Sequence, residues 1–339
     1  MTYTFTNTER NNLKASVFET KSLLYLAAKG KKYNEITVFT VDCFNDVGGM
    51  SDKESIWDVQ AKGEKSLTPR KIGRYLITLY KNYVSVFSPF FQEFIFFMPP
   101  LGEQYLNNST LSCYEIDNFK EAQRFKVIEG LKSAANLEED IDLSGFLAKV
   151  LFVEDRTDEC TYVKRIMQFK SLKLNSDSFY SAIFKEIRDK QTSLKNSDIE
   201  NTRITRPNEV LQLDRHLTSE KLQVFVLNRL IGGDVFSRGN YLPSSYAIFT
   251  RSLDEEEIED HIFEQNAALS RAFFDKNNQK NFWRLFAAIF KEFDGDSTRK
   301  VHQVTESIDE KLIERTAHID MDATRFLVAM IRDGLLSDN

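Results

Sequence analysis

Cysteine and long apolar runs are both scarce in this sequence of 339 residues. Cys43, Cys113 and Cys160 are odd in number and widely spaced, which excludes a disulfide framework and a paired-cysteine zinc site and suits a reducing compartment. Uninterrupted apolar runs, such as 94–99 and 150–153, are all far shorter than the roughly 18 residues of a membrane helix. The first residues are polar, with no apolar stretch after a basic start, so we expect no secretory signal. We therefore expect a soluble cytoplasmic protein that does not contact a membrane.

Histidine and glycine-rich motifs are scarce as well. The four histidines, His216, His261, His302 and His318, are far apart and form no H-E-x-x-H pair, so each is expected to be structural or exposed. The chain has no G-x-x-x-x-G-K-[ST] loop, no G-x-G-x-x-G fingerprint and no G-x-S-x-G elbow. These absences argue against an internal ATPase site, a dinucleotide site and an α/β-hydrolase nucleophile.

The charge of the chain is unevenly distributed. The formal net charge of -6 argues at first against a protein that coats nucleic acid. Residues 1–110, however, are slightly basic, and the remainder carries the whole acidic excess. The densest basic segment, 62–81, has a single acid, Glu64, and six basic residues: Lys62, Lys65, Arg70, Lys71, Arg74 and Lys81. The acidity of the whole chain therefore does not exclude DNA as a partner of this region.

The order of predicted elements indicates an α/β region followed by a helical one. The first part reads as a helix from Thr8 to a stop at Gly30, a strand at 35–42, a turn at Gly48–Gly49, a strand at 55–62, a helix after Thr68-Pro69 and a strand at 90–98. A helix between two strands usually makes a right-handed crossover, which places those strands parallel. Beyond residue 115 we expect helices at 118–135, 158–170, 177–196, 218–231, 254–275, 278–293 and 306–335, with a strand or short helix at 146–154.

These elements predict an α/β core, a mixed sheet flanked by helices, followed by a mainly α-helical domain. We place the boundary near residue 155, so that residues 1–155 form the core and residues 156–339 form a helical domain for assembly or regulation.

The segment 57–62 carries the pattern with the most chemistry. The period of two in a strand sends Asp58, Gln60 and Lys62 to one face, and Trp57, Val59 and Ala61 to the other. Taken alone, the polar face is explained by a solvated strand with a surface ion pair. Asp46 follows the first strand, and a turn can bring it beside this row. Carboxylate and amide oxygens suit Mg²⁺ or Mn²⁺, and a neighbouring lysine can orient water and offset charge on a phosphate.

The helix–strand–acid–strand–(D/E/Q)-x-K–helix–strand order resembles the PD-(D/E)XK nucleases. Gln60-Ala61-Lys62 is similar to the Mrr-type branch, and the match to the double-stranded DNA nuclease domain of bacterial anti-phage effectors, as in cyclic-nucleotide-signalling and Lamassu systems, spans residues 9–100. The resemblance implies a restriction-endonuclease-like fold, Asp46 and Gln60 as metal ligands, Lys62 as the catalytic lysine and Glu19 as an additional acid. Asp42 is a rival for Asp46 as first ligand, and Asp58 is a further candidate.

The resemblance also implies partners. The expected activity is Mg²⁺-dependent (or Mn²⁺-dependent) hydrolysis of double-stranded DNA, with the phosphates held by Lys65, Arg70, Lys71 and Arg74. Because the chain is acidic outside this patch, we expect cutting to require a homo-oligomer, or a sensor or ATPase protein of the same defence system. Two alternatives stay open, a non-catalytic adaptor that keeps the nuclease fold for binding and a nuclease that acts on RNA.

Other patterns have simpler explanations. The acidic run 254–260 is expected to form the first turn of a helix rather than a metal cluster. Trp57 and Trp283 are expected in the core. One apolar stripe has helical spacing, and we expect it to pack in the core, with an oligomer or partner surface as the second explanation: Phe282, Leu285, Phe286, Ile289 and Phe290.

Overall fold

The computed structural model describes residues 2–5, 17–33, 35–138, 140–167, 177–233, 242–296 and 298–337. The chain forms two compact units, which are described separately. The first contains residues 1–166 and 184–221, and the second contains residues 167–183 and 222–339. The chain therefore does not divide at a single point near residue 155, because residues 184–221 return to the first unit.

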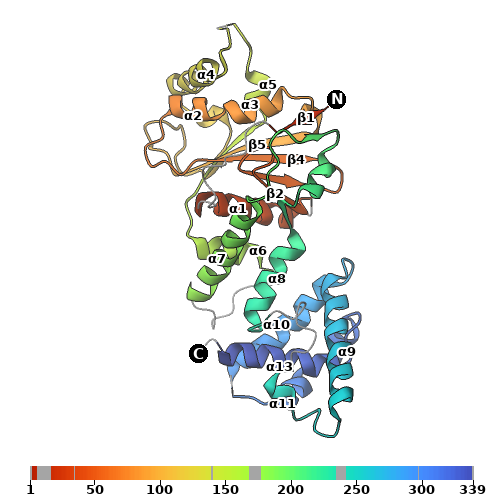
Figure 1. The fold of residues 1–339 in the computed structure, drawn as a ribbon. Coiled ribbons are helices and arrows are strands. Elements are labelled where there is room, and N and C mark those ends of the chain that lie inside the picture. The colour runs from red at the N-terminus through yellow and green to blue at the C-terminus, as the bar shows by residue number, and fades with distance from the viewer. Residues whose placement is uncertain are drawn as a thin grey trace. The chain divides into compact units, whose positions relative to one another are not determined.

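A mixed seven-stranded sheet forms the centre of the first unit (Figure 1). Its order is β6 (Cys113–Tyr114), β7 (Val150–Glu154), β5 (Phe91–Met98), β4 (Ile56–Ala61), β3 (Val47–Met50), β2 (Val38–Val41) and β9 (His216–Thr218). The pairs β4–β5 and β5–β7 are parallel and the other pairs are antiparallel. A separate pair joins β1 (Tyr3–Thr4) to β8 (Arg203–Ile204). The parallel pairing expected of the strands on either side of the helix is confirmed.

The turn expected at Gly48–Gly49 is wrong, because both glycines lie inside β3. A Cβ at Gly48 would be 2.4 Å from Thr40 Oγ1, and one at Gly49 would be 2.9 Å from Ile36 Cγ2. The glycines therefore provide space for neighbouring side chains rather than a turn. The chain reverses instead at 42–46, where Asp42 adopts a φ of 48°, a left-handed conformation that aspartate tolerates better than most residues.

Helices cover both faces of this sheet (Figure 1). On one face α1 (Val17–Tyr33) contacts β3, β4 and α6 (Glu159–Ile166). On the other face lie α2 (Pro69–Tyr75), α3 (Ile77–Tyr83) and α4 (Glu121–Ala135). Helices α2 and α4 cross closely, because Gly73 lies against the Val127 carbonyl and Gly130 against the Arg70 carbonyl. The remaining helices are α5 (Ser144–Leu147) and α7 (Asp177–Leu194), and 3₁₀ turns lie at Ser88–Phe90, Ile116–Asn118 and Pro207–Leu213.

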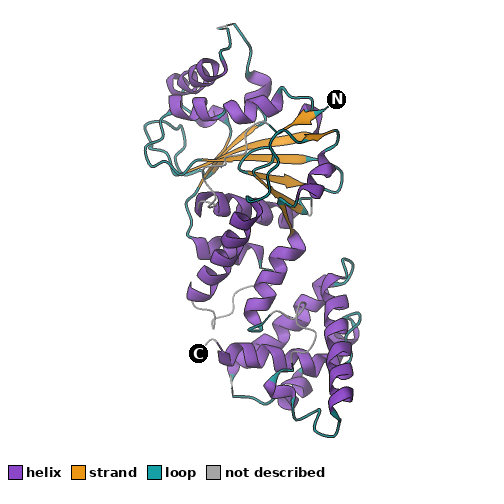
Figure 2. Cartoon of the chain, in the orientation of Figure 1, coloured by secondary structure: helices purple, strands orange, loops and turns teal. Residues whose placement is uncertain are grey.

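The described residues of the second unit form helices joined by loops, with no strand among them (Figure 2). Helix α8 (Ser219–Leu230) enters it, and η4 (Ser244–Tyr246), α9 (Glu255–Phe274), α10 (Gln279–Gly295), α11 (Val301–Ser307), α12 (Glu310–Glu314) and α13 (Met321–Ser337) follow. The apolar stripe of α10 from Phe282 to Phe290 is buried, as are Trp57 and Trp283, so the expected core roles are confirmed. Asp254 caps α9 and exchanges capping-box hydrogen bonds with Glu257, so the acidic run does open a helix.

Several expected boundaries are wrong or lie outside the described residues. Helix α1 continues past Gly30 to Tyr33, and the single helix expected at 306–335 is replaced by α12 and α13, with α11 before them. The expected start at Thr8 lies outside the described residues. The short strands β1, β3, β6, β8 and β9 were not expected, because two to four residues show too little alternation to predict a strand. Within the described residues, no helix has the length and apolarity to cross a membrane.

Candidate functional site

The structure brings Asp46 and Gln60 together. Strands β3 and β4 are antiparallel with Val47 opposite Val59, so Asp46, directly before β3, lies beside Gln60 of β4. The Gln60 amide nitrogen donates to Asp46 Oδ2, and the Ala61 backbone N–H donates to the same oxygen at 2.7 Å. A pair that was expected from spacing alone is therefore in direct contact.

Helix α3 covers the polar row of β4. Thr78 and Asn82 are four residues apart and so lie on one face of α3, while Asp58 and Gln60 are two apart and lie on one face of β4. Thr78 Oγ1 donates to Gln60 Oε1 at 2.6 Å, and Asn82 Nδ2 donates to Asp58 Oδ2 at 2.7 Å. Asp58 is 0% exposed and Gln60 is 3% exposed. The simpler explanation, a solvated strand face, is therefore wrong.

Asp58 belongs to a buried amide cluster. Its Oδ2 also accepts from Asn45 Nδ2 at 2.6 Å, and Asn82 Oδ1 accepts from the Tyr3 hydroxyl at 2.7 Å. Among the described residues Asp58 Oδ1 has no hydrogen-bond partner. Burial raises the pKa of Asp58 to about 7, although the amides of Asn82 and Asn45 favour the charged form. These contacts give Asp58 a role in packing α3 against β4.

The raised pKa of Asp58 predicts a pH-dependent stability. Asp58 binds its proton more tightly in the folded state than in the unfolded state, where the pKa is ~3.9, so its contribution is present at low pH and is lost as pH rises through about 7. Asp58→Asn removes this loss and is expected to make the first unit more stable than wild type at pH 8, by about 1–3 kcal/mol, with little difference at pH 4. Urea unfolding at a series of pH values measures this. Asp140→Asn, an exposed change, is the control, and parallel curves for wild type and Asp58→Asn would contradict the assignment.

A second group of charges surrounds Asp46. Burial raises the pKa of Asp46 to about 7, Lys62 opposes the rise, and Glu19 and Asp42 add to it, so the charges of all three residues act on Asp46. Glu19 comes from the first turn of α1, and Asp42 from the turn after β2. The structure therefore places Glu19 and both rival acids, Asp42 and Asp46, in one cluster with Lys62.

Lys195 is a site residue that the sequence did not reveal. Its ammonium lies 2.7 Å from Glu19 Oε2 and 3.0 Å from Asp42 Oδ2. Burial opposes its charge, but Asp42 and Glu19 together outweigh burial and raise the pKa of Lys195 above its ordinary value. The residue follows α7 at the start of a polar segment that reads as a loop, and no local pattern marks it.

The basic residues of the segment 62–74 divide into two groups. The Lys62 ammonium lies over the Tyr75 ring, 5.7 Å from its centroid, and the Tyr75 hydroxyl donates to Glu64 Oε2 at 3.0 Å. Lys71 pairs with the other oxygen of Glu64. The remaining basic side chains expected to contact phosphates are exposed: Lys65, Arg70 and Arg74.

The residues present fit a cation held by few protein ligands. Among the described residues, no three His, Cys, Asp or Glu side chains converge to hold a metal alone. Mg²⁺ needs only one or two carboxylates when water and phosphate oxygens complete its shell. The acids Glu19, Asp42 and Asp46 share this region with the ammonium groups of Lys62 and Lys195. In the structure the Gln60 amide nitrogen faces Asp46 and its oxygen faces the Thr78 hydroxyl. Because a hydroxyl can accept as well as donate, the amide can also be placed with its oxygen on the Asp46 side, where it could bind a cation.

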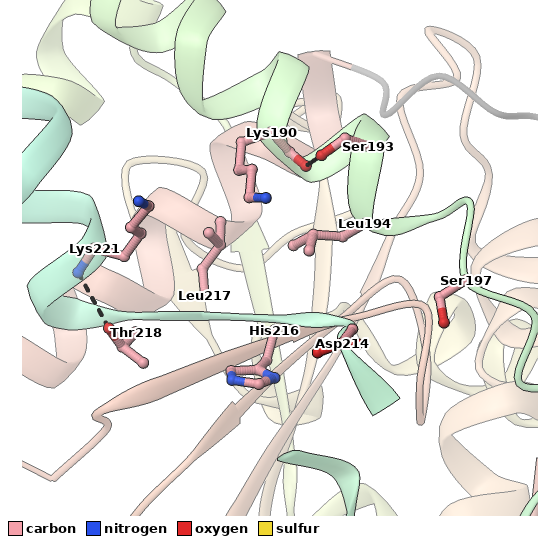
Figure 3. Close-up of a pocket in the computed structure, with 9 residues that line it drawn as sticks. All are labelled: Lys190, Ser193, Leu194, Ser197, Asp214, His216, Leu217, Thr218 and Lys221. Atoms are coloured by element: carbon pink, nitrogen blue, oxygen red, sulfur yellow. Dashed lines mark hydrogen bonds between the residues drawn. The ribbon is translucent and has the colours of Figure 1, made fainter. Parts of the chain in front are cut away.

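A cavity of about 530 Å³ lies elsewhere in the first unit, beside the edge strand β9 (Figure 3). Lys190 and Leu194 of α7, and His216 and Leu217 of β9, are among its lining residues. Leu217 and His216 project to opposite sides of the strand, as strand alternation requires. Neither Asp46 nor Gln60 lines this cavity, so it is distinct from the charged cluster.

No protein-family model, no curated protein and no solved structure matches this chain.

Proposed function

We propose that the chain is a metal-dependent DNA endonuclease with a PD-(D/E)XK-type site, and the effector of a bacterial anti-phage defence system. The contact between Asp46 and Gln60 carries the proposal, because an acid before one strand and an amide on the next meet beside Lys62, as the motif requires. The parallel β4–β5 pair, joined through α2 and α3, supports the same assignment.

Asp46 and Gln60 would hold a divalent cation, which when bound lowers the pKa of water and neutralises phosphate charge. Lys62 orients the attacking water and offsets the charge that builds up on the phosphate. Lys65, Arg70 and Arg74 hold the DNA backbone, while Lys71 is engaged by Glu64. Hydrolysis breaks one phosphodiester P–O bond as the water oxygen bonds to phosphorus. One proton passes to solvent and one to the leaving oxygen.

Cleavage of supercoiled plasmid by the full chain tests this proposal. Cutting is expected with Mg²⁺ or Mn²⁺ and is expected to stop with EDTA. Asp46→Asn is expected to need at least ~10-fold more Mg²⁺, because it removes the charged ligand. Lys53→Ala, an exposed change in the β3–β4 turn, is the control. Cutting that survives EDTA, or that is unaffected by Asp46→Asn, would contradict the metal site. Competition with double-stranded RNA decides between the two nucleic acids.

We also propose that DNA cleavage requires assembly with other copies of the chain or with a partner protein. A chain with a net charge of -6 and a local basic patch is expected to bind DNA weakly by itself. A homo-oligomer, or a sensor or ATPase protein of the same system, would align several patches along one duplex. If the purified chain does not cut, the same assay is repeated with proteins encoded beside it.

One observation favours a second candidate, a non-catalytic adaptor with a nuclease fold. Asp46 already accepts hydrogen bonds from Gln60 and Ala61, and Lys195 already lies between Glu19 and Asp42, so much of the charge is compensated inside the protein. The function of an adaptor would not require a bound divalent cation, and Asp46→Asn would leave that function unchanged.

A further inference from the structure

Lys195 is held between two carboxylates in a part of the site that excludes water. The side chains of Lys195, Glu19 and Asp42 are 2%, 10% and 12% exposed. Its ammonium contacts Glu19 Oε2 at 2.7 Å and Asp42 Oδ2 at 3.0 Å. Two buried carboxylates that face a common point repel each other unless a cation lies between them. In this protein the cation is a side chain.

The backbone around Lys195 is fixed by bonds to the elements that carry both acids. The Arg215 guanidinium donates to the Lys195 carbonyl at 2.9 Å and to the Asp42 carbonyl at 3.1 Å. Thr20, adjacent to Glu19 on α1, donates to Gln191 Oε1 of α7 at 2.9 Å. These contacts hold the carboxyl end of α7 against α1 and the Asp42 turn. Contacts with α1 and with the Asp42 turn therefore both fix the position of Lys195.

The same cluster includes the acid expected to bind a metal. The Asp42 backbone N–H donates to the Asp46 carbonyl at 3.2 Å, and the charges of Glu19, Asp42 and Lys62 all act on the pKa of Asp46. A divalent ion bound by Asp46 and Gln60 would have the Glu19–Lys195–Asp42 group as its neighbour. In two-metal phosphodiesterases a second cation lies about 3.5–4 Å from the first.

We propose that Lys195 takes the place of a second metal ion, so that the site binds a single divalent cation and uses the ammonium to hold Glu19 and Asp42. The proposal rests on the proposed function for the position of the first ion. Lys195 is a positioning residue in this scheme, because it acts through the two acids and not on the substrate.

Counting Mn²⁺ ions on the full chain, without DNA, tests the proposal. Equilibrium dialysis, with free Mn²⁺ read by electron paramagnetic resonance, is expected to give one ion per wild-type chain. Lys195→Met removes the ammonium and keeps an apolar stem of similar length, so it is expected to bind one ion more than wild type. Its unfolding temperature is expected to rise with Mn²⁺ by more than that of wild type. Lys185→Met, an exposed change on the same helix, is expected to match wild type.

Each result separates this proposal from the function proposed above. No gain of an ion in Lys195→Met, or two ions on wild type, overturns the role of Lys195. No ion on wild type but one on Lys195→Met supports Lys195 and contradicts the metal site at Asp46 and Gln60. If Lys195→Met does not fold, the double variant Glu19→Gln, Lys195→Met restores the net charge. It is expected to fold and to bind as many ions as wild type, and a double variant that binds fewer overturns the proposal.

Discussion

Lys62→Met is expected to cut plasmid DNA at least ~100-fold more slowly than wild type, because the loss of a group that orients water and offsets phosphate charge costs ~10²–10⁴ in rate. The fold should tolerate the change. The Lys62 backbone N–H donates to the Phe97 carbonyl at 2.9 Å, which extends the β4–β5 ladder, and this bond does not involve the side chain. The ammonium lies over the Tyr75 ring, a contact of modest energy.

The control for Lys62→Met is the same substitution at a lysine that lies outside the site. Lys53→Met provides it, since Lys53 is exposed in the turn at the opposite end of the β3–β4 hairpin. Single-turnover cleavage, together with Mn²⁺ affinity, separates loss of chemistry from loss of metal. A Lys62→Met variant that cuts within threefold of wild type, or that protects cells from phage as well as wild type does, would refute the role assigned to Lys62.

Arg215→Ala is expected to destabilise the first unit by about 3–5 kcal/mol, since it leaves buried acceptors without a donor. Arg215 is 4% exposed. Its guanidinium donates to the carbonyls of Asp42, Lys195 and Ser197, at 3.1, 2.9 and 2.7 Å. Losing these bonds frees the Asp42 turn and the segment that carries Lys195 together.

Urea unfolding followed by tryptophan fluorescence measures the effect of Arg215→Ala. The chain has two tryptophans, Trp57 in the first unit and Trp283 in the second, so a Trp283→Phe background reports the first unit alone. Arg203→Ala, an exposed change, is the control. A loss of less than about 1 kcal/mol would show that the three carbonyls find other partners.

The site therefore depends on a segment distant from the nuclease-like motif. Residues 184–221 supply Lys195, Arg215 and the edge strand β9, which pairs with β2 in antiparallel register. A fragment that ends at residue 166 contains Glu19, Asp46, Gln60 and Lys62 but lacks these groups. Tests of the site therefore require the full chain.

Long and regular patterns predicted their helices and strands, while short or irregular patterns did not. The strand at 56–61 was expected from its alternating pattern and the strand at 91–98 from its aromatic run, and the helices at 121–135 and 255–274 were expected as well. Strand β3 was taken for a turn because glycine more often marks turns than strand interiors that need space. The last helices were merged because their apolar residues continue across the breaks at 308–309 and 315–320.

The sequence alone determined the local part of the site. The period of a strand put Asp58, Gln60 and Lys62 on one face, and the spacing of Asp46 allowed it to meet Gln60 across a hairpin. Tertiary structure decided which of these groups are buried, since α3 covers Asp58 and Gln60 with Asn82 and Thr78. It also decided that Lys195 pairs with both Glu19 and Asp42. The contact between Glu19 and Lys195 joins residues 176 positions apart. The energy of such an ion pair depends on burial and geometry, which no local sequence pattern records.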